Sequence, residues 1–148
     1  FLTDQFRNRQ VKKVYLALVD GHPPTSDGKV DAAIGRDPTH RKRMTVTSEN
    51  KGRTAVSEYQ TIQRFADHTL LEVRPLTGRT HQIRVHLAFL KCPIVGDKIY
   101  GRRKPTLPIN RHFLHAYKLS VTIPGEAAPQ LFTADIPGEL TKIIDLIS

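Results

Sequence analysis

The spacing of apolar and polar residues along the chain predicts short strands in hairpin-like succession. Residues 14–19 are a continuous apolar run closed by an Asp-Gly pair, which predicts a strand buried on both faces. Partial alternation at 55–65 and the apolar members of 68–75 predict a hairpin. The remaining expected strands are weaker and cover residues 29–34, 44–47, 113–123 and 131–136.

Helical periodicity is confined to a few segments. Residues 2–9 have the charge order of a helix end, and a closing helix is expected from the Pro-Gly-Glu at 137–139 to residue 147. Between them, residues 80–90 place apolar side chains at i, i+4 and i+7, with Thr80 as the expected N-cap. Many strands and few helices predict an α+β fold on a mainly antiparallel sheet.

Composition bounds the class of protein. The 148 residues suit one domain, and the excess of 23 Lys and Arg over 14 Asp and Glu gives a net charge of +9. Such an excess favours a polyanionic partner, such as RNA or an anionic membrane surface. No apolar run approaches the ~20 residues of a membrane span. The single cysteine, Cys92, excludes an internal disulfide and favours a reducing, cytoplasmic location.

The segment 76–88 carries the strongest candidate chemistry. A glycine turn leads into the expected helix with Arg79 and His81 at its start, where exposed N–H groups favour an anion. The plainer interpretation is a strand-to-helix turn capped by Thr80. Arg84 stands between apolar residues and should point inward, so it needs a carboxylate partner. We see no obvious partner in the chain and expect it from a part of the protein that precedes Phe1.

Tyr15 and two basic clusters are further candidates. Tyr15 is either a core residue or a ring that packs against a nucleobase, with a hydroxyl placed for proton transfer. The clusters are either solvated loops or phosphate contacts, and their separation in two loops favours RNA. Their principal members are Arg36, Arg41, Lys42, Arg43, Arg102 and Arg103. The histidines are scattered without metal-ligand spacing, so we expect no metal site.

Five segments, in this order, resemble the RluA/RluD-type RNA pseudouridine synthases, most closely the RluD branch. The central one is Thr-Gly-Arg-Thr-His-Gln-Ile-Arg-Val-His-Leu-Ala at 77–88. The others are residues 6–21, which carry Tyr15, the basic stretch 34–44, Pro-Ile-Val-Gly-Asp at 93–97 with Tyr-Gly at 100–101, and Phe-Leu-His-Ala at 113–116.

The resemblance implies a fold, a reaction and roles for particular residues. It implies part of the pseudouridine synthase catalytic fold and the isomerisation of uridine in structured RNA, most of all large-subunit ribosomal RNA, without a cofactor. Tyr15 and Arg84 would be catalytic, and Leu114 would support the uracil from below. The remaining substrate contacts would come from Arg79, His81 and Gln82.

The resemblance also has a gap. The family's catalytic aspartate lies in an His-Arg-Leu-Asp segment that this chain does not contain, so we expect the chain alone to be inactive and Arg84 to pair with that aspartate. The alternative is a non-catalytic RNA-binding module of the same fold.

Overall fold

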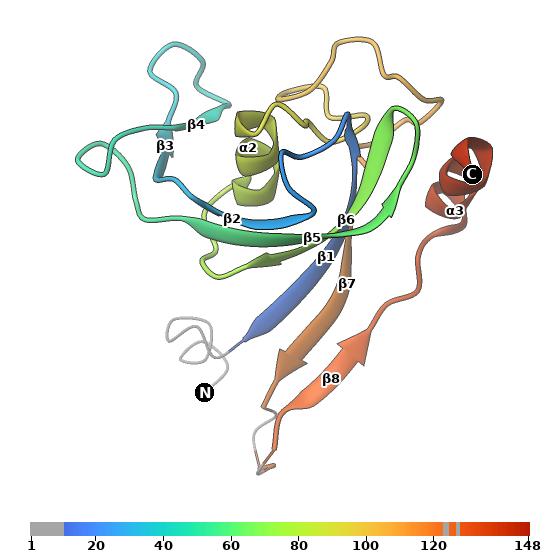
Figure 1. Ribbon diagram of the computed structural model, residues 1–148. Helices are drawn as coiled ribbons and strands as arrows, with labels where there is room; N and C mark the ends of the chain where they lie inside the picture. The colour runs from blue at the N-terminus through green and yellow to red at the C-terminus, as the bar shows by residue number, and fades with distance from the viewer. Residues whose placement is uncertain (1–10, 123–124, 127) are drawn as a thin grey trace.

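The computed structural model describes residues 11–122, 125–126 and 128–148, and it centres on one antiparallel sheet (Figure 1). The helix expected at 2–9 lies outside the described residues. Six strands pair in the order β2-β5-β6-β1-β7-β8, every pairing being antiparallel, which confirms the predicted α+β class. The strands are β1 (Lys12–Asp20), β2 (Asp27–Asp31), β5 (Val56–Arg64), β6 (His68–Pro75), β7 (Leu114–Val121) and β8 (Gln130–Thr133).

The apolar run at 14–19 becomes the centre of the sheet. β1 pairs with β6 on one side and β7 on the other, and Leu16 to Asp20 are all buried, as the sequence predicts. A central strand covered on both faces needs apolar side chains at successive positions, which explains the lack of alternation. The predicted hairpin of β5 and β6 is also confirmed.

A separate hairpin, β3 (Ile34–Arg36) and β4 (Met44–Val46), stands apart from the large sheet (Figure 1). The single strand expected at 29–34 was wrong, because β2 ends at Asp31 and the chain turns away before Ile34. Ile34 instead exchanges backbone hydrogen bonds with Arg53. The segment expected to be one strand is therefore divided between β2 of the large sheet and β3 of the small one.

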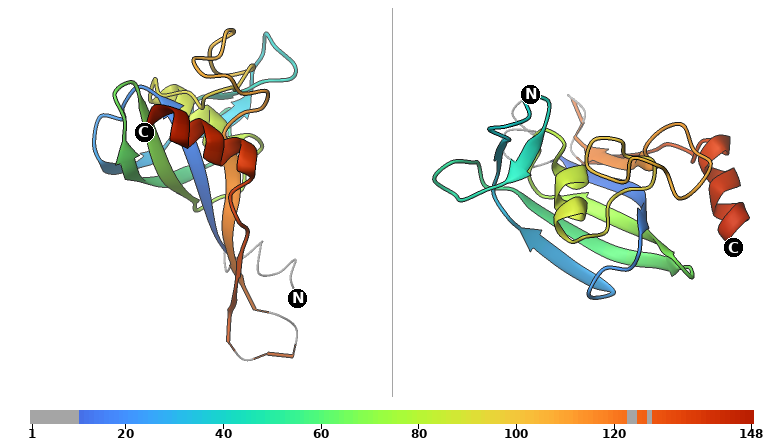
Figure 2. Two further views of the ribbon diagram at one scale, coloured as in Figure 1. Left: turned by 90° about the vertical axis from the view of Figure 1, so that its right-hand side faces the viewer. Right: turned by 90° about the horizontal axis from the view of Figure 1, so that it is seen from above.

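Helix α2 (Gln82–Phe89) packs on the sheet, and α3 (Gly138–Ile147) closes the chain (Figures 1 and 2). The apolar stripe of α2 enters the main core, to which α3 adds Leu140 and Ile143. The expected cap at Thr80 was wrong: His81 is the N-cap residue, in a left-handed conformation with φ 56°. Neither described helix is long and apolar enough to cross a membrane.

Candidate active site

One open cavity of about 360 Å³ gathers residues from three separate segments. Its lining residues come from β1, from the turn between β6 and α2 with the first residues of that helix, and from the start of β7. All six side chains to which the resemblance assigns catalysis or substrate binding line this cavity: Tyr15, Arg79, His81, Gln82, Arg84 and Leu114. Residues far apart in sequence therefore converge on one cavity.

Arg84 has a carboxylate partner within the chain. Its Nε donates to Asp97 Oδ2 at 2.8 Å and its Nη2 donates to Asp97 Oδ1 at 2.9 Å, a bidentate pair. The Arg84 side chain is 13% exposed and that of Asp97 is fully buried. The sequence shows no obvious partner for Arg84 in this chain and we expected one before Phe1, whereas Asp97 is such a partner. Asp97 belongs to one of the resembling segments, but it was missed as the partner because it lies thirteen residues away in an expected loop.

The loop backbone fixes Asp97 in place. Gly96 has φ +81°, and a side chain there would collide with the carbonyl of Arg111. Asp97 Oδ1 also accepts the N–H groups of Ile99 at 3.0 Å and Tyr100 at 3.1 Å. Burial raises the pKa of Asp97, but the Arg84 guanidinium and these backbone N–H groups outweigh it, so the pKa is lowered overall. Asp97 is therefore charged at neutral pH and holds the guanidinium in one plane.

Tyr15 lies next to an irregularity in the pairing of β1 with β7. The pairing of β1 with β7 is interrupted between Val14 and Tyr15, while Tyr15 stays opposite Val73 of β6. Burial raises the pKa of the Tyr15 phenol, so the hydroxyl keeps its proton at neutral pH. The half-buried ring thus offers the cavity an aromatic surface and a proton donor.

Gln82 lines the cavity, but its amide is committed to the protein. Its Oε1 accepts from the Thr77 hydroxyl at 2.6 Å and the Arg79 N–H at 3.0 Å. Its Nε2 donates to Val56 O and Ser57 Oγ, both at 2.9 Å. These four bonds use the whole ordinary capacity of the amide. Gln82 therefore shapes the turn at 77–81 that leads into α2.

The buried chain of hydrogen bonds continues to His86. Because Ser57 Oγ accepts from Gln82, its own hydrogen is available to His86 Nδ1 at 2.8 Å, and His86 Nε2 donates to Ala32 O at 2.9 Å. Burial lowers the pKa of His86, against the opposing effect of its bond to Ala32. The ring is a neutral core histidine.

Arg79 and Leu114 both line the cavity, and each is held in place by a hydrogen bond to another part of the chain. Arg79 Nε donates to Thr54 O at 2.8 Å. The backbone of Leu114 is fixed by Arg111, whose Nη2 donates to Leu114 O at 3.0 Å. His112, two residues earlier, also lines the cavity, and its pKa is lowered by burial and by the nearby Arg84 charge.

The first basic cluster lies on and around the β3–β4 hairpin. Arg36, Arg41 and Lys42 are exposed, and Arg36 Nη1 donates to Arg41 O at 3.3 Å. Arg43 is only half-exposed, because its Nη2 donates to Ile99 O at 2.6 Å. Arg43 thus fastens the hairpin to the loop that carries Asp97, while the other three offer charge to the outside.

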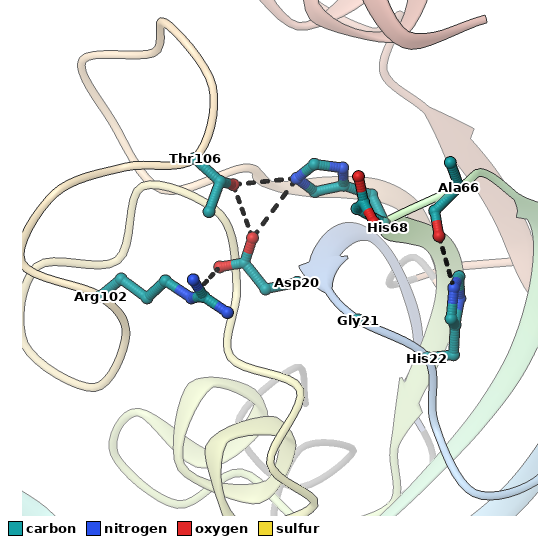
Figure 3. Close-up of a pocket in the computed structure, with 8 residues that line it drawn as sticks. Asp20, Gly21, His22, Ala66, His68, Arg102 and Thr106 are labelled. Atoms are coloured by element: carbon teal, nitrogen blue, oxygen red, sulfur yellow. Dashed lines mark hydrogen bonds and ion pairs between the residues drawn. The ribbon is translucent and has the colours of Figure 1, made fainter.

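The second basic cluster belongs to a loop that a buried acid ties down. Asp20, at the end of β1, accepts from Thr106 Oγ1 at 2.6 Å, and Thr106 Oγ1 is 2.9 Å from His68 Nε2 (Figure 3). Arg102 Nε approaches Asp20 at 3.9 Å but stays largely exposed, as does Arg103. A second cavity of about 460 Å³ is lined by Asp20, His68, Arg102 and Thr106, among others. Sequence reasoning treated Asp20 only as part of a turn and missed this anchor.

The hairpin and the second basic loop project from the same end of the sheet (Figures 1 and 2). The two basic segments are far apart in the sequence, but both therefore lie toward the same end of the fold (Figures 1 and 2). Within the described residues, no group of three or more potential His, Cys, Asp or Glu ligands is placed to hold a metal ion.

Comparison with known proteins gives consistent results. The family model for RNA pseudouridylate synthase matches residues 1–89. An uncharacterized RNA pseudouridine synthase of Chloroflexus aurantiacus is 48% identical over 143 residues, covering 97% of this chain and 44% of that protein. Ribosomal large subunit pseudouridine synthase D of Borreliella burgdorferi is 38% identical over 137 residues, covering 93% of this chain and 41% of that protein.

The fold agrees with the sequence comparison. Human RNA Pseudouridylate Synthase Domain Containing 4 superimposes with a TM-score of 0.80 at 27% identity, covering 98% of this chain and 65% of that structure. Human RNA Pseudouridylate Synthase Domain Containing 1 gives 0.78 at 29% identity, with coverages of 92% and 59%. The chain spans less than half the length of the two bacterial relatives. It belongs to the RNA pseudouridylate synthase family, in its RluA/RluD-type group.

Proposed function

We propose that this chain forms one side of the active site of an enzyme that converts uridine to pseudouridine in structured RNA. In that isomerisation the C1′–N1 bond breaks, a C1′–C5 bond forms, and the proton displaced from C5 is balanced by one gained at N1. The observation that carries the proposal is the convergence of Tyr15, Arg84 and Leu114 on one cavity.

We assign Arg84 to orienting a second carboxylate. A guanidinium has five N–H groups, and Asp97 engages two of them. The remaining N–H groups are available to the catalytic aspartate of the His-Arg-Leu-Asp segment, which the sequence of this chain lacks. Asp97 then acts as the fixed anchor, and the chain by itself is expected to be inactive.

Tyr15 and Leu114 are assigned to holding the uracil. An aromatic ring stacks on any base, and Leu114 lines the same cavity from β7, the strand that pairs with β1. Because burial raises the pKa of Tyr15, the phenol retains its proton at neutral pH. That favours packing and proton donation over the role of general base.

The substrate we propose is large-subunit ribosomal RNA, met in the cytoplasm. The exposed basic residues at one end of the fold suit phosphate contacts, and the relative from Borreliella burgdorferi is named for the ribosomal large subunit. A stacked uridine cannot present its glycosidic bond to a cavity of this kind, so the target base is expected to flip out.

Arg84→Lys in the full-length protein tests the catalytic assignment. Lysine lacks the planar fork, so the second carboxylate would lose its orientation, and a misplacement of about 1 Å costs turnover about a hundredfold. RNA binding should be nearly unchanged, measured by filter binding beside pseudouridine formation. Arg74→Lys is the matched control, since Arg74 makes one partly exposed contact with Glu72 at 3.4 Å.

Two results would overturn the proposal. Full activity of Arg84→Lys would remove the role given to Arg84. A full-length gene without an His-Arg-Leu-Asp segment would favour the non-catalytic RNA-binding module. Mapping pseudouridine in ribosomal RNA from cells lacking the gene then identifies the substrate.

A further inference from the structure

His81 adopts a backbone conformation that a residue with a side chain rarely adopts. Its φ of 56° and ψ of 22° lie in the left-handed region, where the Cβ crowds the following carbonyl. The side chain makes no capping hydrogen bond to the helix that it begins. It lines the active-site cavity instead. Strain of this kind points to a functional constraint on where the imidazole lies.

Tyr100 holds the imidazole from the side of the basic hairpin. His81 Nδ1 lies 2.7 Å from Tyr100 Oη, with the two rings edge to face at a centroid distance of 5.5 Å. The same hydroxyl accepts the Met44 N–H at 2.9 Å. The Tyr100 ring also lies under the Arg84 guanidinium, 5.1 Å from its centroid. One residue thus contacts the hairpin, the helix start and the proposed catalytic arginine.

The direction of these hydrogen bonds fixes the tautomer of His81. A backbone N–H can only donate, so Met44 occupies a lone pair of Tyr100 Oη and leaves the hydroxyl hydrogen for another acceptor. Within the described part of the chain, His81 Nδ1 is the acceptor in reach. Burial and the Arg84 charge lower the pKa of His81, against a smaller opposing effect of Asp97, so the ring is neutral at neutral pH. A neutral ring that accepts at Nδ1 carries its hydrogen at Nε2.

We propose that Tyr100 is a positioning residue that keeps His81 as the Nε2–H tautomer, so that this N–H donates to a carbonyl oxygen of the uracil in the cavity. The inference rests on the proposed function and deepens it. Uracil has carbonyl oxygens at C2 and C4, whereas cytosine has a donating amino group at C4. A fixed donor that faces C4 therefore favours uracil over cytosine, because the amino group of cytosine is also a donor and the two groups could not pair; the C2 carbonyl, which both bases carry, gives no such preference.

The tautomer can be measured without any catalytic assay. In the full-length protein labelled with ¹⁵N-histidine, the His81 signals are assigned by their loss in His81→Gln. We expect Nδ1 to have the chemical shift of an unprotonated nitrogen and Nε2 that of a protonated one. Tyr100→Phe should convert this to a mixture of tautomers. The control is Tyr59→Phe, which removes one hydroxyl bond, to Thr25 at 2.9 Å, outside the cavity.

A protonated Nδ1 in the unmodified protein, or an unchanged tautomer in Tyr100→Phe, would overturn the positioning role. The donor role is tested by single-turnover pseudouridine formation at saturating RNA, which removes differences in binding. Tyr100→Phe should lower the rate about fivefold, the size expected for one partly buried hydrogen bond. A changed tautomer with an unchanged rate would refute donation to the uracil. If even the unmodified protein makes no pseudouridine, the proposed function fails, while the tautomer result still decides the role of Tyr100.

Discussion

The buried pair of Arg84 and Asp97 gives the sharpest stability prediction. In Asp97→Asn, Oδ1 can still accept from Arg84 Nη2, Ile99 and Tyr100. The second oxygen becomes an amide NH₂ that faces Arg84 Nε–H, which now lies 2.8 Å from Asp97 Oδ2. Two donors then oppose each other, and the guanidinium loses its only charged partner among the described residues.

The magnitude follows from the burial of each partner. Removing one member of a buried ion pair costs about 3–5 kcal/mol, because the other charge stays buried without compensation. The Asp97 side chain is fully buried, but Arg84 is 13% exposed at the cavity, where water relieves part of its charge. We therefore expect the free energy of unfolding to fall by about 3 kcal/mol, the lower end of that range.

Urea unfolding of the full-length protein at pH 7, followed by circular dichroism, measures this loss. Glu139→Gln is the matched control, because Glu139 is 57% exposed and meets Arg111 at 3.4 Å. That exposed pair should contribute less than about 1 kcal/mol. A loss of under about 1 kcal/mol in Asp97→Asn would refute the argument that the carboxylate compensates a buried charge.

The pair of Arg84 and Asp97 also predicts that the stability of the protein depends on pH. The pKa of Asp97 is lowered in the folded state, so its contribution is present above the unfolded value of about 3.9 and is lost as pH falls below it. The difference in stability between the unmodified protein and Asp97→Asn should therefore shrink in acid. A constant difference from pH 7 to pH 3 would contradict the assigned pKa direction.

Three further predictions concern the rest of the molecule. Replacing Arg41 and Lys42 by Ala should weaken RNA binding. The slope of log affinity against log salt concentration should become smaller by about 1–2, because each phosphate that is no longer neutralised contributes about 0.7–0.9. An unchanged slope would show that both residues face solvent. Thr106→Val should lower the free energy of unfolding by about 1–2 kcal/mol because its hydrogen bonds with Asp20 and His68 cannot form. Thr141→Val, which removes one exposed hydrogen bond at 3.4 Å, is its control, and equal effects would refute the anchoring role. Burial lowers the pKa of His86, so the unfolded state binds its proton first and stability should fall as pH drops below about 6.5. Urea unfolding measured from pH 7.5 to 5.5 gives the free energy of unfolding at each pH. This free energy should fall less steeply with decreasing pH in His86→Gln than in the unmodified protein.

The sequence by itself determined the sheet, most of the strands and the family. The apolar run of β1, the period of the β5–β6 hairpin and the ordered motifs are local or linear features, so they can be read without contacts. Residues of the cavity were also predictable, since the resemblance carries Tyr15, Arg84 and Leu114 by motif.

Only the tertiary structure decided which groups pair. Asp97 and Asp20 are single acids at the ends of apolar segments, and nothing in their own neighbourhood distinguishes a buried partner from a turn residue. The bond between Arg84 and Asp97 needs the loop after α2 to fold back, and the bond between Asp20 and Thr106 joins residues eighty-six positions apart. The helix begins after His81 and not at Thr80, and the turn before it is held by bonds of the Gln82 side chain to Thr77 and Arg79 that local sequence does not show. Local propensity determines where strands and helices form, whereas the partner of a buried charge depends on contacts that exist only after the chain has packed.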